Sequence, residues 1–295
     1  MAPRHGGPTV AVLGMVRAER EQGIDAVILS SDDDVGACLG VPLKEWIMHE
    51  GVPVFFLPRM PAKQHTLVGF TYTPDYPAWM AANVGKFDFV HVHTVFSHPA
   101  NTAMRACRRA GVPYCVRPLG QLCHWSLQQR RWIKELQLAL FTRRNIDGAS
   151  FIHCTSEMEA RETGEAGFRS PCEVLPHGLV MPPRIVNARE RLRADLGLPA
   201  DRLVVVFMAR IHQKKGVELL IEAAGRLDLP FDLVVVGSGE EEYVSKLQQQ
   251  AASTLKGRAH WLGFRAGDDK WCVLQGADVF VLPSHSENFG IAVLE

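Results

Sequence analysis

The last ten residues of the chain hold two carboxylates in a setting that suits nucleotide chemistry. Glu287 and Glu295 flank an apolar turn that follows a run, 277–284, typical of a parallel strand covered on both faces. From Phe289 onward a helix can begin, and its unpaired backbone N–H groups and positive dipole end attract phosphates. An acid beside a phosphate is better suited to accept hydrogen bonds from hydroxyls. The segment predicts a nucleotide or nucleotide-sugar site; the alternatives are a solvated loop acid for Glu287 and an exposed helix residue for Glu295.

Two cations follow an earlier strand. Arg210 comes just after the apolar run 203–208, and Lys215 stands where the next helical segment begins. We expect both to face the crevice beyond the strand ends, opposite the Glu287 loop. A guanidinium and an ammonium that converge there can neutralise a diphosphate and stabilise the charge that develops as a nucleotide departs. An ordinary solvated basic loop is the alternative.

The first half of the chain offers a histidine pair. His91 and His93 share one face at the end of a predicted strand, with His98 nearby. The HxH spacing is compatible with a metal site, but no acidic and histidine residues complete a ligand set, so we expect no metal. A structural role is favoured for His91, whereas His93 at the strand tip is a candidate for lining a cleft. Arg117, at the end of the next strand, is expected to face the same space.

These residues are predicted to stand on alternating strands and helices. A helix is expected from Gly6-Gly7-Pro8 to about Glu21, and a Pro-rich linker is expected near residue 182. Strands are predicted at 26–30, 53–57, 87–93, 114–117, 151–155, 172–175, 203–208, 232–236, 260–262 and 278–282. The intervening helices are predicted at 99–110, 128–144, 156–166, 188–196, 216–227, 240–253 and 268–276. The alternation predicts an α/β fold with two doubly wound Rossmann-like domains, 1–182 and 183–295, facing across a cleft that holds the active site.

Composition narrows the function classes. The chain has 295 residues, 47% hydrophobic and 22% charged, with 32 basic and 32 acidic residues. A formal net charge of zero gives no support for nucleic-acid binding as the main task. Seven scattered cysteines without a CxxC pair indicate a reducing compartment, and the sequence shows neither a membrane-spanning stretch nor a signal-peptide pattern. We expect a cytoplasmic protein, with peripheral contact to the inner face of a membrane as an option.

The motifs of the second half resemble those of one enzyme family. They are Arg210 with Lys215-Gly216, Gly237-Ser238-Gly239, Trp261-Leu262-Gly263-Phe264, Pro283-Ser284, Glu287-Asn288-Phe289-Gly290 and Glu295. In order and spacing they are similar to the motifs of retaining family-4 glycosyltransferases (glycosyl transferases group 1) of the GT-B fold. The first half resembles that family more loosely, through Gly6-Gly7-Pro8, His91-Val92-His93 and Ser156-Glu157.

The resemblance implies a role for each matching residue. Arg210 and Lys215 would hold the donor diphosphate, and Glu287 would accept hydroxyls of the donor sugar. The backbone of Asn288, Phe289, Gly290 and Ile291 would approach sugar and phosphate, Glu295 would accept the ribose hydroxyls, and Gly263 and Phe264 would border the base. Gly7 would let the acceptor domain approach the phosphates. The resemblance also implies transfer with retention, with neither a metal cofactor nor a protein nucleophile.

The two ends of the chain depart from the family pattern. Only Met1 to His5 precede Gly6-Gly7, where the family has a central strand, and the family's second domain continues well past Glu295. We therefore expect a first domain that lacks its first strand, with apolar surface left unpartnered, and an incomplete second domain. Both point to a fragment of a longer reading frame whose own activity is open.

The implied function is transfer of a sugar from a nucleotide-diphosphate sugar to a glycan or lipid-linked acceptor in polysaccharide or glycoconjugate biosynthesis. Two alternatives remain: a non-catalytic nucleotide-sugar-binding fragment, and a nucleotide-sugar epimerase of the same architecture. An NAD-dependent enzyme is disfavoured because no GxGxxG follows a first strand. The sequence does not identify the sugar, the base or the acceptor.

Overall fold

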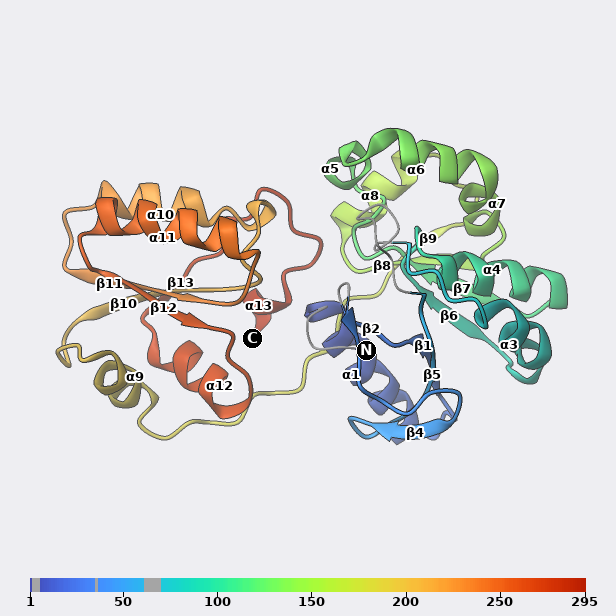
Figure 1. Cartoon of the computed structure of the whole chain (residues 1–295), viewed down its shortest axis with the longest axis horizontal. Helices are drawn as coiled ribbons and strands as arrows, with labels where there is room; N and C mark the ends of the chain where they lie inside the picture. Colours follow the sequence, from blue (N-terminus) through green and yellow to red (C-terminus); the bar gives the residue numbers. More distant parts are fainter. Residues whose placement is uncertain (2–5, 35–36, 61–69) are drawn as a thin grey trace. The chain divides into compact units, whose positions relative to one another are not determined.

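The fold is described by a computed structural model that covers residues 1, 6–34, 37–60 and 70–295. The chain divides into two compact units, Met1–Gly178 (unit 1) and Leu179–Glu295 (unit 2). In the part of the chain that the structure describes, unit 1 contains more than one sheet and unit 2 contains one, and each unit has its own apolar cores (Figure 1).

Unit 1 alternates helices and strands. Its helical segments are α1 (Gly7–Glu21), α3 (Tyr76–Asn83), η2 (Val84–Lys86), α4 (His98–Ala110), α5 (His124–Gln128), α6 (Arg131–Gln137), η3 (Leu138–Thr142), α7 (Arg143–Ile146) and α8 (Glu157–Glu165). Its strands are β1 (Ile28–Ser31), β2 (Asp33–Asp34), β3 (Ala37–Cys38), β4 (Trp46–His49), β5 (Val52–Leu57), β6 (Val90–His93), β7 (Tyr114–Arg117), β8 (Phe151–Cys154) and β9 (Cys172–Val174).

The strands of unit 1 form two main sheets. One has the order β1-β5-β4, with β4 antiparallel to β5, and the other is the parallel sheet β6-β7-β8-β9. The sequence predicted alternating strands and helices but missed β4, α3 and the short antiparallel pair β2-β3. Among the described residues, β1 pairs only with β5 and β6 only with β7, so each of these strands has an edge without a strand partner.

Local signals explain where the helices of unit 1 begin and end. The Ser97 hydroxyl accepts a hydrogen bond from the N–H of Ala100 at the start of α4, and Gly111 closes that helix with a φ of 70°. Ser156 caps α8 in the same way. The single helix predicted over 128–144 is wrong, because Arg130 has a left-handed φ of 50° before α6 and η3 is a π-helical segment.

Unit 2 contains the predicted doubly wound sheet. Its helical segments are α9 (Ala188–Leu196), η4 (Gln213–Lys215), α10 (Val217–Gly225), α11 (Glu241–Leu255), α12 (Gly267–Gly276) and α13 (Ile291–Leu294). Its strands are β10 (Leu203–Met208), β11 (Phe231–Val236), β12 (Ala259–Gly263) and β13 (Val279–Phe280), all parallel in the order β12-β11-β10-β13.

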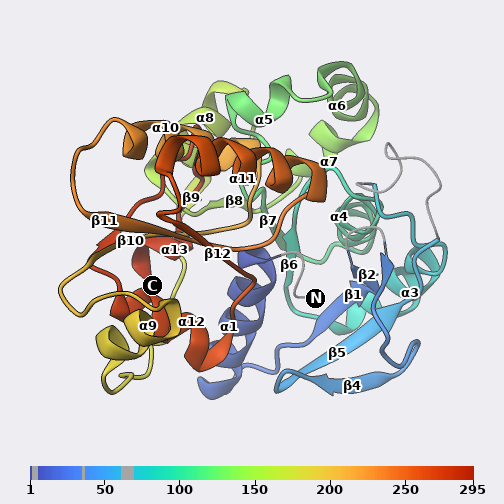
Figure 2. The same ribbon diagram turned by 60° about the vertical axis from the view of Figure 1, so that its left-hand side comes forward.

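The two faces of this sheet are covered by different helices. Successive side chains of a strand point to opposite faces, and in β10 the residues Val204, Val206 and Met208 join a core with α9 and α12. Phe207 and Val205 join the other core, with α10 and α11. Figures 1 and 2 show these helix pairs on the two sides of the sheet. Burial on both faces is the reason that these strands read as continuous apolar runs.

No helix among the described residues combines the length and the apolar character that a membrane span requires.

Candidate functional site

The predicted cation and acid of unit 2 meet directly. The Lys215 Nζ atom lies 2.5 Å from the Glu287 Oε2 atom, and the two side chains are 18% and 31% exposed. The Ser284 hydroxyl donates a second hydrogen bond to the same carboxylate oxygen, over 3.1 Å. An ammonium and a carboxylate of opposite charge are thus held side by side at the carboxyl ends of β10 and β13.

A glycine makes this meeting possible. Gly216 has a φ of 65°, and a Cβ atom at that position would lie 2.2 Å from the carbonyl oxygen of Pro283. Only glycine tolerates both the left-handed backbone and so close an approach. The two loops are also joined by a hydrogen bond of 2.9 Å from the His285 N–H to the Lys214 carbonyl. The Lys-Gly pair of the sequence motif therefore has a steric reason: the glycine lets the lysine loop touch the glutamate loop.

Arg210 is exposed on the same loop and has no hydrogen bond or ion pair within the described part of the chain. Its loop rests on the glycine turn: a Cβ atom at Gly237 would lie 1.9 Å from the Ala209 carbonyl oxygen, and one at Gly239 would lie 2.2 Å from that of Ile211. The turn, which by sequence could have been plain chain reversal, thus supports the loop that carries the predicted phosphate-binding guanidinium.

Positive potential gathers at this edge of the sheet. Partial burial lowers the pKa of His212, and the nearby charges of Arg210, Lys214 and Lys215 lower it further, whereas Glu240 opposes the shift. With His212 neutral, the charged groups of this loop are three cations, of which Lys215 is already paired with Glu287. Such an edge suits a polyanion such as a diphosphate.

The residues predicted to border the base and the sugar lie on the loops that follow β12 and β13. Gly263 ends β12 with a φ of 67°, and its carbonyl accepts a hydrogen bond of 2.8 Å from the Gly237 N–H. Phe264 follows it and is 62% exposed. Asn288 and Phe289 are half-buried. Residues 263 and 264 are thereby tied to the glycine turn that supports Arg210.

The helix start after Glu287 differs slightly from the prediction. Gly290 precedes α13 with a φ of 77°, and the helix begins at Ile291 and not at Phe289. The left-handed conformation of Gly290 is the reason, because it interrupts the chain just before the first helical residue.

Glu295 has a partner that the sequence did not reveal. Its Oε1 atom lies 2.5 Å from the Nζ atom of Lys270 on α12, and its side chain is only 12% exposed. The Lys270 ammonium also lies 4.5 Å from the centre of the Trp271 ring. One carboxylate oxygen of Glu295 is therefore engaged with Lys270, which fixes the side chain.

The histidines of unit 1 form a stack. The ring centres of His91 and His93 are 4.4 Å apart, those of His91 and His153 are 5.0 Å apart, and the His91 Nε2 and His153 Nδ1 atoms are 3.2 Å apart. Burial lowers the pKa of His91 to about 3, with help from the positive charge of Arg117. These rings are neutral at pH 7, and His91 is packed as a structural histidine would be.

Arg117 is buried at the end of β7, with 1% of its surface exposed. Its Nη2 atom donates a hydrogen bond to the ring of His177, whereas its Nε and Nη1 atoms and the Nδ1 atom of His93 have no hydrogen-bond partner in the described chain. Burial lowers the pKa of Arg117 to about 10, so the guanidinium keeps its charge. A buried cation with unused donors can bind an anionic group.

Some predicted residues converge and others do not. Lys215, Glu287 and Arg210 share one loop cluster in unit 2, and His93 and Arg117 share the adjacent ends of β6 and β7 in unit 1. Gly7 begins α1 in unit 1, with Gly6 before it at a φ of 69°. Within the described residues, no group of three or more His, Cys, Asp or Glu side chains is arranged to hold a metal ion.

The geometry agrees with two family models. The model described as "Glycosyl transferase 4-like domain" matches residues 6–178, which is more than half of the chain, and the model described as "Glycosyl transferases group 1" matches residues 188–295. The chain belongs to the group 1 glycosyltransferases.

Two curated relatives of the family extend over much of the chain. A D-inositol 3-phosphate glycosyltransferase of Arthrobacter sp. (strain FB24) is 28% identical and covers 72% of the chain and 52% of its own length. EpsF of Bacillus subtilis (strain 168) is a protein assigned as a glycosyltransferase, and it is 29% identical to this chain. The match covers 72% of this chain and 55% of EpsF. The chain thus spans about half the length of these relatives.

Solved structures establish the GT-B fold of this family member. Anabaena Alr3699/HepE, crystallised with UDP and glucose, has a TM-score of 0.75 at 20% identity and covers 100% of this chain, which covers 75% of it. Sucrose-phosphate synthase from Thermosynechococcus elongatus has a TM-score of 0.73 at 18% identity, and the match covers 97% of this chain and 72% of the synthase chain.

Proposed function

We propose that the protein transfers a sugar, with retention of configuration, from a nucleotide-diphosphate sugar to a glycan or lipid-linked acceptor in polysaccharide or glycoconjugate biosynthesis. In this proposal residues 183–295 bind the donor and residues 1–182 bind the acceptor. Family membership supports the reaction class. The observation that carries the donor assignment is the pairing of Lys215 with Glu287, on the same loop as Arg210, whose guanidinium has no partner among the residues that the structure describes.

The ion pair suggests how the donor is received. A diphosphate that reaches Arg210 competes with Glu287 for the ammonium of Lys215, because a phosphate carries more negative charge than a carboxylate. Once Lys215 turns to the phosphate, the Glu287 carboxylate becomes available for hydroxyls of the sugar. The two cations then stabilise the negative charge that grows on the leaving nucleotide. No metal cofactor and no protein nucleophile enters this scheme.

The ribose is assigned to Glu295. Lys270 engages its Oε1 atom, and the second oxygen can accept ribose hydroxyls without breaking that pair. The exposed ring of Phe264 offers a flat apolar surface for the base. The complexes of Alr3699/HepE with UDP and with UDP-glucose support a nucleotide-sugar donor and make UDP-glucose a reasonable first probe.

The acceptor is assigned to the strand ends of unit 1. His93 and Arg117 supply unused polar atoms there, and the name of the Arthrobacter relative, which acts on D-inositol 3-phosphate, supports an acceptor with an anionic group. All seven cysteines are free thiols, which supports a cytoplasmic site of action. A lipid-linked acceptor would bring the protein to the inner face of the membrane.

Calorimetric titration with a panel of nucleotide-diphosphate sugars tests the donor site. We expect UDP-glucose or another panel member to bind, and Lys215→Met and Arg210→Met to weaken binding roughly tenfold or more each. Lys246→Met, which removes an exposed lysine of α11, is the matched control and should leave binding unchanged. Equal binding by the wild-type chain and both site variants would disprove the donor site.

Transfer to acceptors is tested separately, with the anomeric configuration of the product read by NMR. Loss of transfer in Lys215→Ala and Glu287→Ala supports the mechanism, whereas turnover retained in both contradicts it. Donor binding without transfer to any acceptor favours a binding module. Isomerised sugar formed without acceptor favours an epimerase.

A further inference from the structure

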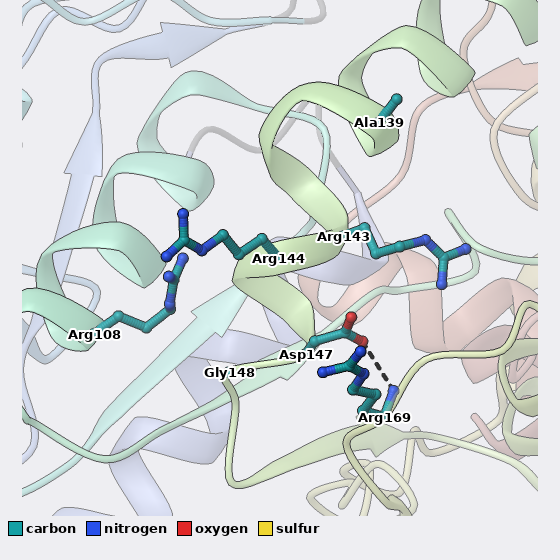
Figure 3. Close-up of a pocket in the computed structure, with 7 residues that line it drawn as sticks. All are labelled: Arg108, Ala139, Arg143, Arg144, Asp147, Gly148 and Arg169. Carbon is teal, nitrogen blue, oxygen red and sulfur yellow. Dashed lines mark hydrogen bonds between the residues drawn. The ribbon is translucent and has the colours of Figure 1, made fainter.

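Unit 1 has a cavity lined mainly by arginines, away from the strand ends that hold His93 and Arg117. Its volume is about 450 Å³, and its lining residues are Arg108, Ala139, Arg143, Arg144, Asp147, Gly148 and Arg169. This volume lies within the range of roughly 300–1,000 Å³ that is usual for small-molecule sites. Four arginines and one aspartate therefore line a space large enough for a ligand (Figure 3).

Separate segments of the chain bring these cations together. Arg108 belongs to α4, Arg143 and Arg144 belong to α7, and Arg169 lies in the loop between α8 and β9. Basic residues in the last turn of a helix are ordinary, because they oppose the negative dipole end. That explanation covers each arginine of α4 and α7 by itself, but it does not explain Arg169 or why all four arginines line one cavity.

Two of the four arginines have structural partners. Arg143 donates hydrogen bonds of 3.0 and 2.9 Å to the carbonyls of Ala166 and Gly167, and it points away from Arg144 in Figure 3. Arg108 donates one hydrogen bond of 2.9 Å to the Asn145 side chain. Most of the donors of Arg108 are left for another acceptor.

The other two arginines have no such partner. Neither Arg144 nor Arg169 has a side-chain hydrogen bond or ion pair with any described residue. The guanidinium ends of Arg108 and Arg144 point toward one another. Asp147 accepts a hydrogen bond of 2.8 Å from the backbone N–H of Arg169, and in Figure 3 its carboxylate lies on the side of Arg169, away from the facing guanidinium groups of Arg108 and Arg144.

Gly148 contributes to this arrangement through its missing side chain. A Cβ atom there would lie 2.7 Å from the Cδ atom of Arg108 and 3.0 Å from the Tyr114 hydroxyl. The glycine allows Arg108 to lie flat along the wall of the cavity. Any larger residue would displace the arginine.

We infer that this cavity binds a phosphate group through Arg108, Arg144 and Arg169. Like charges that face one another repel, and an anion between them turns the repulsion into charge-assisted hydrogen bonds. Phosphate monoesters and diesters suit guanidinium groups because their oxygens accept paired N–H bonds. A free phosphate and the headgroup of an anionic lipid share this chemistry. The site is independent of the proposed donor site in unit 2.

The test compares the wild-type chain with Arg144→Gln/Arg169→Gln, with Arg191→Gln as a control that removes one exposed arginine of unit 2. Calorimetry measures binding of inorganic phosphate, and flotation measures binding to vesicles of phosphatidylcholine with and without phosphatidylglycerol. All titrations are repeated in the Lys215→Ala background, so that phosphate bound at the donor site is not counted.

We expect the double variant to lose roughly tenfold or more in affinity and the control to keep the wild-type affinity. Arg144→Lys/Arg169→Lys, which keeps the charge, should also bind more weakly, because lysine cannot form paired bonds. Selective loss of phosphate binding identifies a free phosphate group, not a lipid headgroup, as the ligand. Selective loss of vesicle binding that depends on phosphatidylglycerol identifies a lipid headgroup.

Two further variants guard against misfolding as the cause of a loss. Ala139→Asp adds a carboxylate at an exposed position of the lining, and Gly148→Ala displaces chiefly the flexible side chain of Arg108, with the new Cβ atom 3.0 Å from the Tyr114 hydroxyl. Both should weaken binding while the circular dichroism spectrum stays unchanged. If neither phosphate nor anionic vesicles distinguish the wild-type chain from the double variant, the inference is wrong.

Discussion

Replacement of Gly216 by alanine should destabilise unit 2 more than the addition of a single methyl group usually does. The new Cβ atom would lie 2.2 Å from the Pro283 carbonyl oxygen, where real Cβ atoms do not come closer than 3.0 Å. The oxygen belongs to the backbone, so relief requires the two loops to separate. Their separation would also pull Lys215 from Glu287.

The expected loss of stability has two parts. The left-handed φ of 65° costs an alanine about 1–2 kcal/mol. Overpacking against a rigid neighbour adds about 1–3 kcal/mol. Gly216→Ala should therefore lower the free energy of unfolding by about 2–5 kcal/mol.

Gly197 provides a matched control. It closes α9 in the same unit with the same φ of 65°, but nothing lies within 4 Å of the position where its Cβ would be. Gly197→Ala should carry only the backbone cost of about 1–2 kcal/mol. Urea denaturation of both variants, followed by tryptophan fluorescence, measures the difference. Equal losses in the two variants would refute the close contact between Gly216 and Pro283.

Three further predictions concern buried ionisable side chains. Arg193→Met should destabilise unit 2 by about 3–5 kcal/mol in urea denaturation, because the 2%-exposed guanidinium pairs with Asp278 over 2.5 Å. Arg191→Met on the same helix is the control and should change the free energy of unfolding by less than about 0.5 kcal/mol. Equal losses in the two variants would contradict the role of the ion pair. Glu159→Gln should lower the melting temperature of the chain, because the buried carboxylate accepts three hydrogen bonds of 2.6, 2.7 and 2.9 Å and the loss of one costs about 1–3 kcal/mol. The free energy of unfolding should fall as the pH drops below about 6.5, by up to about 1.4 kcal/mol per pH unit for each buried histidine. The sign follows because burial lowers the folded-state pKa of His91 to about 3, so the unfolded chain takes up the proton first as the pH falls. Denaturation at a series of pH values measures the dependence of the free energy of unfolding on pH. If His91→Gln leaves that dependence unchanged, the reasoning is wrong.

The fold was predictable wherever neighbouring residues carry the signal. Ser97 and Gly111 mark the two ends of α4, and the glycines before α1 mark its start within one residue. The strands of the unit 2 sheet appeared as apolar runs because both of their faces are buried. By contrast, β4 lies at a sheet edge with alternating exposed residues, so its pattern was too weak to separate from a loop. The break at Arg130 and the π-helical turn after α6 had no sequence signal.

The candidate site was predictable in part for the same reason. Arg210, Lys215 and Glu287 could be predicted as site residues because each follows a predicted strand, and ligands of α/β sheets bind beyond the carboxyl ends of parallel strands. The sequence did not show that Lys215 and Glu287, 72 positions apart, form an ion pair. It also gave no sign that Lys270 holds Glu295.

The sequence by itself determined most of the strands and helices, the division into two α/β halves and the residue types that could bind a nucleotide sugar. These follow from periodicity, caps and turn residues, which act over a few positions. Only the tertiary structure decided which distant groups touch: the lysine loop on the glutamate loop at Gly216, the histidine stack beside Arg117, and the arginines around one cavity. Such contacts depend on sheet order and packing, which join residues that no local pattern connects.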